Sequence, residues 1–126
     1  MTQTEINEVL RLHKLWLKYE GGKRAILDGQ DLSGLDLDGA LLDKASLKGA
    51  SLYRASLDYS CLPLWCGSLT AHFDDRQLKQ IAYHLVKAGL HSKNASAETK
   101  RILSNPDLVA FANGFHRVDE CGRIKP

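Results

Sequence analysis

Leucine recurs every five residues, without a gap, from Leu27 to Leu62. Two positions before each leucine stands a mostly small residue, such as Ala25, Ala45 or Ala55. A period of five fits neither an α-helix, with about 3.6 residues per turn, nor a β-strand, whose side chains alternate with a period of about two. A fixed repeat sets the architecture before local propensities do. The spacing therefore predicts a square-sectioned β-solenoid in which each five-residue unit forms one side.

Length and composition restrict the class of protein. The 126 residues indicate one domain, or one small domain with appendages, and 44% of them are hydrophobic. No stretch approaches the roughly 18 uninterrupted apolar residues of a membrane span. The N-terminus lacks the basic and then apolar pattern of a secretion signal. The cysteines are Cys61, Cys66 and Cys121. Their odd number, and the lack of the spacing seen in disulfide-bonded domains, favour a reduced, cytoplasmic protein.

Charge is distributed unevenly along the chain. Residues 1–24 carry five basic against three acidic residues, and residues 63–126 carry nine against six. The repeat between them, residues 25–62, carries three basic against six acidic residues. An acidic middle therefore lies between two mildly basic ends. The net charge of +2 is too small to indicate nucleic-acid binding by itself.

A helix is predicted for residues 1–22. Thr2 and Glu5 have the spacing of a capping box, and Gly21-Gly22 ends the segment. We expect this helix to cover the open end of the solenoid, with binding to a partner as the alternative. Its histidine is expected to be a core-edge residue rather than a ligand. The apolar face has spacings of three and four: Ile6, Val9, Leu10, His13, Trp16 and Leu17.

Residues 65–117 are predicted to form a C-terminal helical region. The first helix begins at Asp74 or Asp75, ends at Gly89, and buries a face of four residues. Ser96 begins a short second helix that reaches Leu103, and Asn105-Pro106 begins a third that ends at Asn113-Gly114. The tail, residues 118–126, is expected to be loosely ordered. The expected buried face of the first helix is Leu78, Ile81, Ala82 and Leu85.

The sequence favours a protein that is not an enzyme. Its histidines stand in no catalytic or phosphate-binding motif, so no catalytic or cofactor-binding residue is assigned. A zinc site from Cys61, Cys66, His72 and His84 matches no standard spacing, and no metal ligand is assigned. Direct nucleic-acid binding is not favoured either, because few aromatic residues lie among the basic residues of the C-terminal region.

The tandem units from Ala25 to Leu62 resemble the pentapeptide-repeat family, whose signature is Ala-Asp/Asn-Leu followed by two variable residues. The resemblance implies that the leucine and the small residue point inward and that four units make one right-handed coil. It places residues twenty apart above one another, as Leu27 under Leu47. The expected fold is α+β: a short two-coil, right-handed, quadrilateral β-solenoid over residues 25–64, capped by the N-terminal helix and the C-terminal helical region. Gln30 and Leu35 are expected to contact the N-terminal helix.

The same register sorts the outward residues into four sides. The fourth side, with Leu41, Cys61 and Leu64, is apolar, and we expect the C-terminal region to dock there. The third side, extended at one corner, forms an acidic patch with aromatic neighbours, which is a plausible surface for contact with a partner. The partner-binding candidates are Asp31, Asp36, Asp38 and Asp58 with Tyr53, Arg54 and Tyr59.

Segments outside the repeat, His13–Leu17 with Gly21-Gly22 and Leu62–Leu69 with Asp74–Gln77, resemble phage- or prophage-encoded pentapeptide-repeat proteins. This implies a cytoplasmic protein that inhibits a host protein or a protein–nucleic acid complex, for example a CRISPR defence complex or a topoisomerase, by surface contact or partial DNA mimicry. One alternative is a structural or assembly module that acts as a homodimer or larger homo-oligomer. Another is a nucleic-acid- or metal-binding regulator that uses the C-terminal helices.

Overall fold

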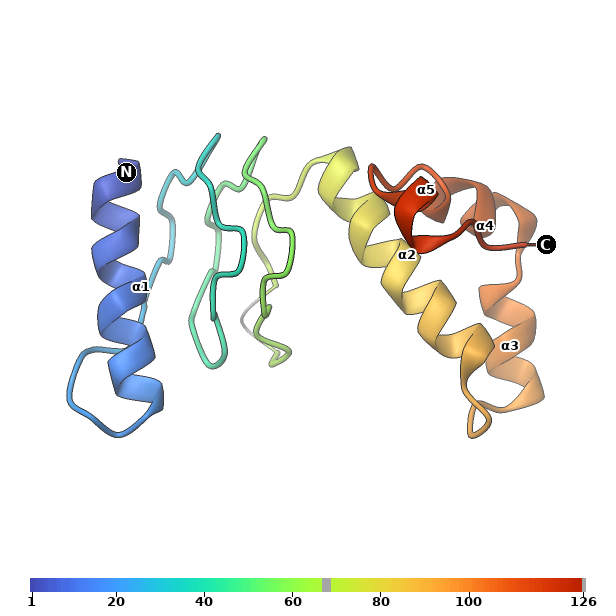
Figure 1. Cartoon of the computed structure of the whole chain (residues 1–126), viewed down its shortest axis with the longest axis horizontal. Helices are drawn as coiled ribbons and strands as arrows, with labels where there is room; N and C mark the ends of the chain where they lie inside the picture. The colour runs from blue at the N-terminus through green and yellow to red at the C-terminus, as the bar shows by residue number, and fades with distance from the viewer. Residues whose placement is uncertain (67–68, 126) are drawn as a thin grey trace. The chain divides into compact units, whose positions relative to one another are not determined.

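The computed structural model describes residues 1–66 and 69–125. The chain divides into two compact units, Met1–Asp74 and Asp75–Pro126. The first holds the leucine repeat and one helix, and the second holds the remaining helices (Figure 1). No described helix is long and apolar enough to cross a membrane.

The first unit begins with α1, Gln3–Leu17. The predicted capping box is confirmed: the Thr2 side chain accepts the Glu5 N–H at 3.1 Å, and the Glu5 carboxylate accepts the Thr2 N–H at 3.0 Å. Hydrogen bonding of the carboxylate to Thr2, through the backbone first and the side chain second, lowers the pKa of Glu5. After the helix the chain turns back through Gly22, which has a φ of +75°. A Cβ at Gly22 would lie 2.1 Å from the Leu12 carbonyl oxygen, so no larger residue fits this turn.

Residues 25–64 stack in two layers, which we call the first coil (25–44) and the second coil (45–64). Parallel bridges pair residues twenty apart, as Ile26 with Ser46 and Asp36 with Ser56. Backbone hydrogen bonds of about 3 Å join the layers, for example from the Leu27 N–H to the Ser46 carbonyl at 2.8 Å. The predicted register of twenty is therefore present. The bridges stay isolated because a tight turn interrupts the pairing in every five-residue unit, so no continuous strand develops.

The repeated leucines form the core of the first unit. Seven of them are 5% exposed or less, and burying a leucine side chain stabilises a fold by about 1.5–3 kcal/mol. Leu35 packs partly buried against this core. Gln30, in contrast, is exposed, so the expectation that it reaches inward toward the N-terminal helix is wrong. The buried leucines are Leu27, Leu32, Leu37, Leu42, Leu47, Leu52 and Leu57.

Helix α1 packs against the first coil (Figure 1), and Ile6 is fully buried in the leucine core. Gln3 binds both backbone groups of Asp36, at 2.8 Å each. In the second coil the equivalent backbone groups of Ser56 pair with the first coil. The side chain of Gln3 thus binds backbone groups that a further coil would otherwise bind.

His13 completes these contacts, as expected of a core histidine. It is fully buried, and its Nδ1 accepts the Ala25 N–H at 3.0 Å. Since Nδ1 is the acceptor, Nε2 carries the proton and donates to the Asp43 carbonyl oxygen at 2.7 Å. One imidazole therefore satisfies two backbone groups of the first coil.

The opposite end of the core is covered by residues 70–74. The His72 N–H donates to the Ala50 carbonyl at 2.8 Å, and the His72 carbonyl accepts the Leu52 N–H at 3.0 Å. Ser51 pairs with His72, a separation of twenty-one residues instead of twenty. Ala71 and Phe73 pack against the leucine core. This segment is therefore a partial third layer, displaced by one residue from the register of the repeat.

The second unit contains α2 (Asp75–His91), α3 (Ala97–Leu103), α4 (Pro106–Ala112) and α5 (Val118–Cys121). Ser96 caps α3 by accepting the Thr99 N–H, and Asn105 caps α4, both as predicted. The unit has its own core. The buried residues of this core are Tyr83, Val86, Leu103, Val109, Ala112, Phe115, Val118 and Ile124.

Two predictions for α2 are wrong. Gly89 does not end the helix, which continues to His91. The glycine instead allows a close approach, because a Cβ there would lie 2.1 Å from Cδ1 of Leu103 on α3. The expected buried face is also wrong for Leu78 and Leu85, which are 41% and 57% exposed, whereas Ala82 does pack against the core, which Tyr83 and Val86 form on this helix.

The expectation of a loosely ordered tail is wrong as well. The tail includes α5, and both Val118 and Ile124 are buried in the core of the second unit. The Asn113 side chain binds both backbone groups of Ile124 at 2.8 Å. The Tyr83 hydroxyl donates to the Gly122 carbonyl at 2.6 Å. Asn113 and Tyr83, together with Lys87, which donates to the Cys121 carbonyl at 2.6 Å, thus hold this segment against the helices.

Candidate functional site

Three of the predicted acidic residues come together on the repeat. The Asp38 N–H donates to the Asp36 carboxylate, and the Asp58 N–H donates to the Asp38 carboxylate, both at 2.9 Å. The Ser56 hydroxyl also donates to Asp36, at 3.3 Å. These bonds hold the carboxylates of Asp36 and Asp38 in place, and Asp58 lies one coil above Asp38 on the same side. Each still has lone pairs for a partner's ammonium or guanidinium group.

Asp31 lies on the neighbouring side, where it pairs with Ser51. Its carboxylate accepts the Ser33 N–H at 3.0 Å. Hydrogen bonding to Ser33, through the side chain first and the backbone second, lowers the pKa of Asp31. Asp31 is thus a neighbour of the other three aspartates and is not hydrogen-bonded to them.

The remaining candidates divide between these two sides. Tyr53 and Arg54 stand above Ser33 and Gly34, and the Arg54 guanidinium lies 5.2 Å from the centre of the Tyr53 ring. Tyr59 follows Asp58 and is 79% exposed. We call all seven residues the acidic surface: Asp31, Asp36, Asp38, Asp58, Tyr53, Arg54 and Tyr59.

Two of these side chains occupy strained turns. Arg54 and Tyr59 have φ values of 61° and 60°, whereas the first coil has Gly34 and Gly39 at the equivalent positions. A residue with a Cβ in this left-handed region costs about 1–2 kcal/mol. The second coil thus carries large exposed side chains where a glycine would be less strained.

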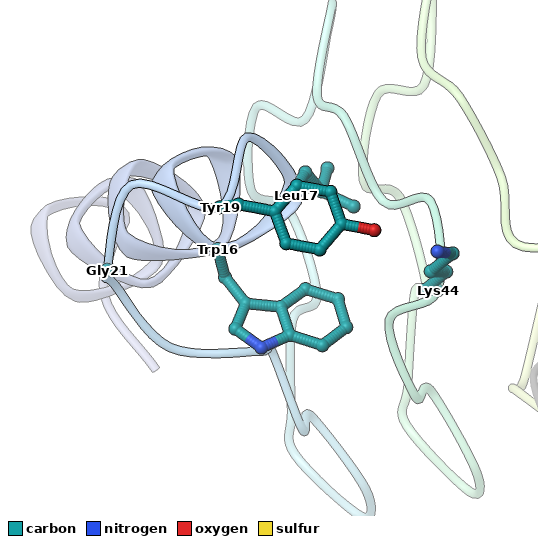
Figure 2. Close-up of a pocket in the computed structure, with 5 residues that line it drawn as sticks. All are labelled: Trp16, Leu17, Tyr19, Gly21 and Lys44. Carbon is teal, nitrogen blue, oxygen red and sulfur yellow. The ribbon is translucent and has the colours of Figure 1, made fainter.

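A second site lies at the end of α1, where residues distant in the sequence meet. One pocket of about 370 Å³ is lined by Trp16, Leu17, Tyr19, Gly21 and Lys44. Figure 2 shows Trp16 and Tyr19 at the end of the helix with Lys44 across from them on the repeat. A pocket of about 310 Å³ shares Trp16 and Lys44 and is completed by Arg24 and Trp65. We call the two together the aromatic–basic pocket.

Sequence reasoning missed this pocket, although the repeat register contained a signal for it. Lys44 lies one coil above Arg24, whose Nε donates to the Lys44 carbonyl at 2.6 Å. Trp65 lies one coil above Ala45, and its indole N–H donates to the Ala45 carbonyl at 3.0 Å. Extending the register of twenty by one position at each end would have brought these residues together.

No group of three or more His, Cys, Asp or Glu side chains in the described part of the chain is placed to hold a metal ion. The cysteines are free and exposed. His84 packs edge-on against Tyr83 and Phe115, and burial, followed by the nearby Lys87, lowers its pKa. Its aromatic contacts give it a packing role in the second unit.

Comparison with known proteins agrees with the geometry of the repeat. Residues 24–63 match the family model for pentapeptide repeats, in eight copies. The match confirms the repeat that the leucine spacing predicted. It covers both coils and leaves α1 and the second unit outside. No curated protein and no solved structure matches the chain significantly.

Proposed function

We propose that the protein is a non-enzymatic binding module that uses the acidic surface to contact a positively charged partner. The repeat would act as a rigid, right-handed, four-sided β-solenoid, closed by α1 at one end and by residues 70–74 at the other. Proteins with pentapeptide repeats often take part in protein–protein interaction, which agrees with this role. The observation that carries the proposal is the ladder of Asp36, Asp38 and Asp58 on one side of the coils, in which the carboxylates of Asp36 and Asp38 each accept a backbone N–H at 2.9 Å.

The partner we propose is a host protein or protein–nucleic acid complex with a basic groove, such as a CRISPR defence complex or a topoisomerase. The chain would then be a phage-type cytoplasmic inhibitor. Stacked layers lie about 4.8 Å apart, whereas duplex DNA carries one negative charge per about 1.7 Å of its axis. The ladder therefore imitates a few phosphates at most. Inhibition would rest on local surface contact, with Tyr59 and Arg54 adding contact area, more than on imitation of a whole duplex.

The test uses the triple variant Asp36→Asn, Asp38→Asn, Asp58→Asn. Asparagine keeps an oxygen that can accept the same backbone N–H groups, so the variant removes charge while the turns remain. We expect its affinity for the partner complex to fall by at least about tenfold and to lose most of its salt dependence. The matched control is Asp107→Asn with Asp119→Asn in the second unit. Affinity is measured by capture of purified candidate complexes at two salt concentrations.

A second pair of variants tests the aromatic part of the surface. Arg54→Gly and Tyr59→Gly remove the side chains and relax the left-handed turns, so a loss of capture cannot be attributed to unfolding. Unchanged capture by the triple aspartate variant would contradict the proposal.

The alternative, a self-assembling module, is favoured by the exposed Leu85 and Ile102 of the second unit. A dimer in light scattering, without capture of any complex, would support that alternative.

A further inference from the structure

We propose that the aromatic–basic pocket binds a nucleotide, with the base stacked on Trp16 and the phosphate held by Lys44 and its basic neighbours. This site is separate from the acidic surface and has the opposite charge. It goes beyond the proposed function, because nothing in the contact between the acidic surface and a partner requires it.

The two tryptophans offer flat apolar surfaces that are held in place. Trp16 stacks on His13 with ring centres 5.7 Å apart and an angle of 18° between the planes. His13 is itself fixed by its two backbone hydrogen bonds. Since His13 covers one face of the Trp16 ring, a ligand would stack on the other. Trp65 is 40% exposed and anchored by its indole N–H. Stacking of a base on an aromatic ring contributes about 1–3 kcal/mol.

The charges around these rings select the ligand. The Arg24 guanidinium and the Lys48 ammonium each lie 5.6 Å from the centre of the Trp65 ring. Lys44 lines both parts of the pocket, and no carboxylate lines either. Among the described residues, none forms an ion pair with Arg24, Lys44 or Lys48. Three cations beside two aromatic rings repel a cationic ligand and favour an anion that carries a planar ring.

The size and backbone of the pocket agree with a small ligand. Its two parts, of about 370 and 310 Å³, lie near the lower end of the usual range of roughly 300–1,000 Å³ for ligand sites. Tyr19 and Lys44 both have left-handed φ values, 59° and 61°. Each therefore lines the pocket at a conformational cost, which glycine at the same position would avoid. Left-handed residues that carry side chains tend to persist at functional sites for this reason.

The experiment is a titration of tryptophan fluorescence. The chain has two tryptophans, and both line this pocket, so the signal reports on the site directly. Uridine 5′-monophosphate and single-stranded oligo(dT) are the two nucleotide probes, which separate a free nucleotide from one within a strand. Inorganic polyphosphate supplies charge without a base, and polyglutamate supplies charge on a peptide. We expect saturable quenching by at least one nucleotide probe and none by polyphosphate or polyglutamate.

The decisive variant is Lys44→Gly, which removes the ammonium group and relaxes the backbone. We expect its nucleotide affinity to fall by about tenfold or more, as for loss of a charge-assisted hydrogen bond. Lys48→Ala should weaken binding as well. The matched control, Lys100→Ala on α3, should bind like the natural chain. Absence of quenching by both nucleotide probes would overturn the proposal. Equal quenching by polyphosphate or polyglutamate would do so too, as would unchanged affinity of Lys44→Gly.

Discussion

The two ends of the leucine core are closed in different ways. At one end α1 lies against the first coil, and the side chains of Gln3 and His13 bind its backbone groups. At the other end residues 70–74 continue the backbone pairing as a partial layer. The first closure depends on the chemistry of particular side chains. The second depends mainly on main-chain groups, which every residue except proline supplies in full, and is completed by the Asp74 carboxylate, which accepts the Arg54 N–H at 2.7 Å.

This difference predicts how each end responds to mutation. Removing a side chain from the α1 end leaves buried backbone groups without a partner, which is costly. Removing the side chain of His72, in contrast, leaves its backbone pairing in place. Both tryptophans belong to the first unit, so urea unfolding followed by tryptophan fluorescence measures the stability of that unit alone.

The largest effect is expected for His13→Ala. The change would leave the Ala25 N–H and the Asp43 carbonyl without their partner, at about 1–3 kcal/mol for each group. The matched control is His72→Ala, because His72 is exposed and contributes its backbone to the pairing. It should change the free energy of unfolding by less than about 0.5 kcal/mol. Similar losses for the two histidines would show that the two ends are not closed differently.

A somewhat smaller effect is expected for Ile6→Ala, which removes a fully buried side chain from α1. Such truncations cost about 2–5 kcal/mol. Its counterpart at the other end is Phe73→Ala, and Phe73 is only partly buried against the core. We expect Phe73→Ala to cost clearly less, although phenylalanine is the larger residue. A greater loss for Phe73→Ala than for Ile6→Ala would contradict the comparison.

The smallest effect is expected for Trp65→Phe. Phenylalanine keeps an aromatic ring but lacks the N–H that binds the Ala45 carbonyl. We expect a loss of about 1 kcal/mol, the usual net contribution of one hydrogen bond, seen as a lower midpoint of thermal unfolding by circular dichroism. The result sharpens the comparison, because Trp65, like Asp74, uses its side chain to bind a backbone group on this side. An unchanged midpoint would mean that the indole N–H does not contribute to this closure.

Much of the first unit could be predicted from the sequence because its periodicity is strict. The five-residue spacing, together with the four-unit coil that the family resemblance implies, predicted the register of twenty and with it the positions of Asp36, Asp38 and Asp58 on one side. Local chemistry gave the helix beginnings at Thr2, Ser96 and Asn105. The repeat and the helix starts each depend on residues that are close in the sequence, so they can be predicted from one sequence.

Other features could not be predicted, since they depend on contacts between distant residues. Glycine commonly ends a helix, but Gly89 lies within α2, where its lack of a side chain leaves room for Leu103. The exposed Leu78 has the spacing of a buried face, yet Tyr83 and Val86 make the core. The aromatic–basic pocket joins Trp16 at the end of α1, which lies outside the repeat register, to Arg24, Lys44 and Trp65. Docking of the C-terminal helices on the apolar side of the repeat stays a prediction.

The displacement at His72 has a consequence for how copies of the chain could associate. Layers that pair through parallel bridges present open backbone groups at each end, and such an edge can recruit another chain into a growing fibre. A second copy that paired with residues 70–74 would meet a layer displaced by one residue. Its leucines could then not stack in register on the leucines of the repeat. At the other end α1 occupies the place that a copy would take. The same features that close the core thus oppose polymerisation.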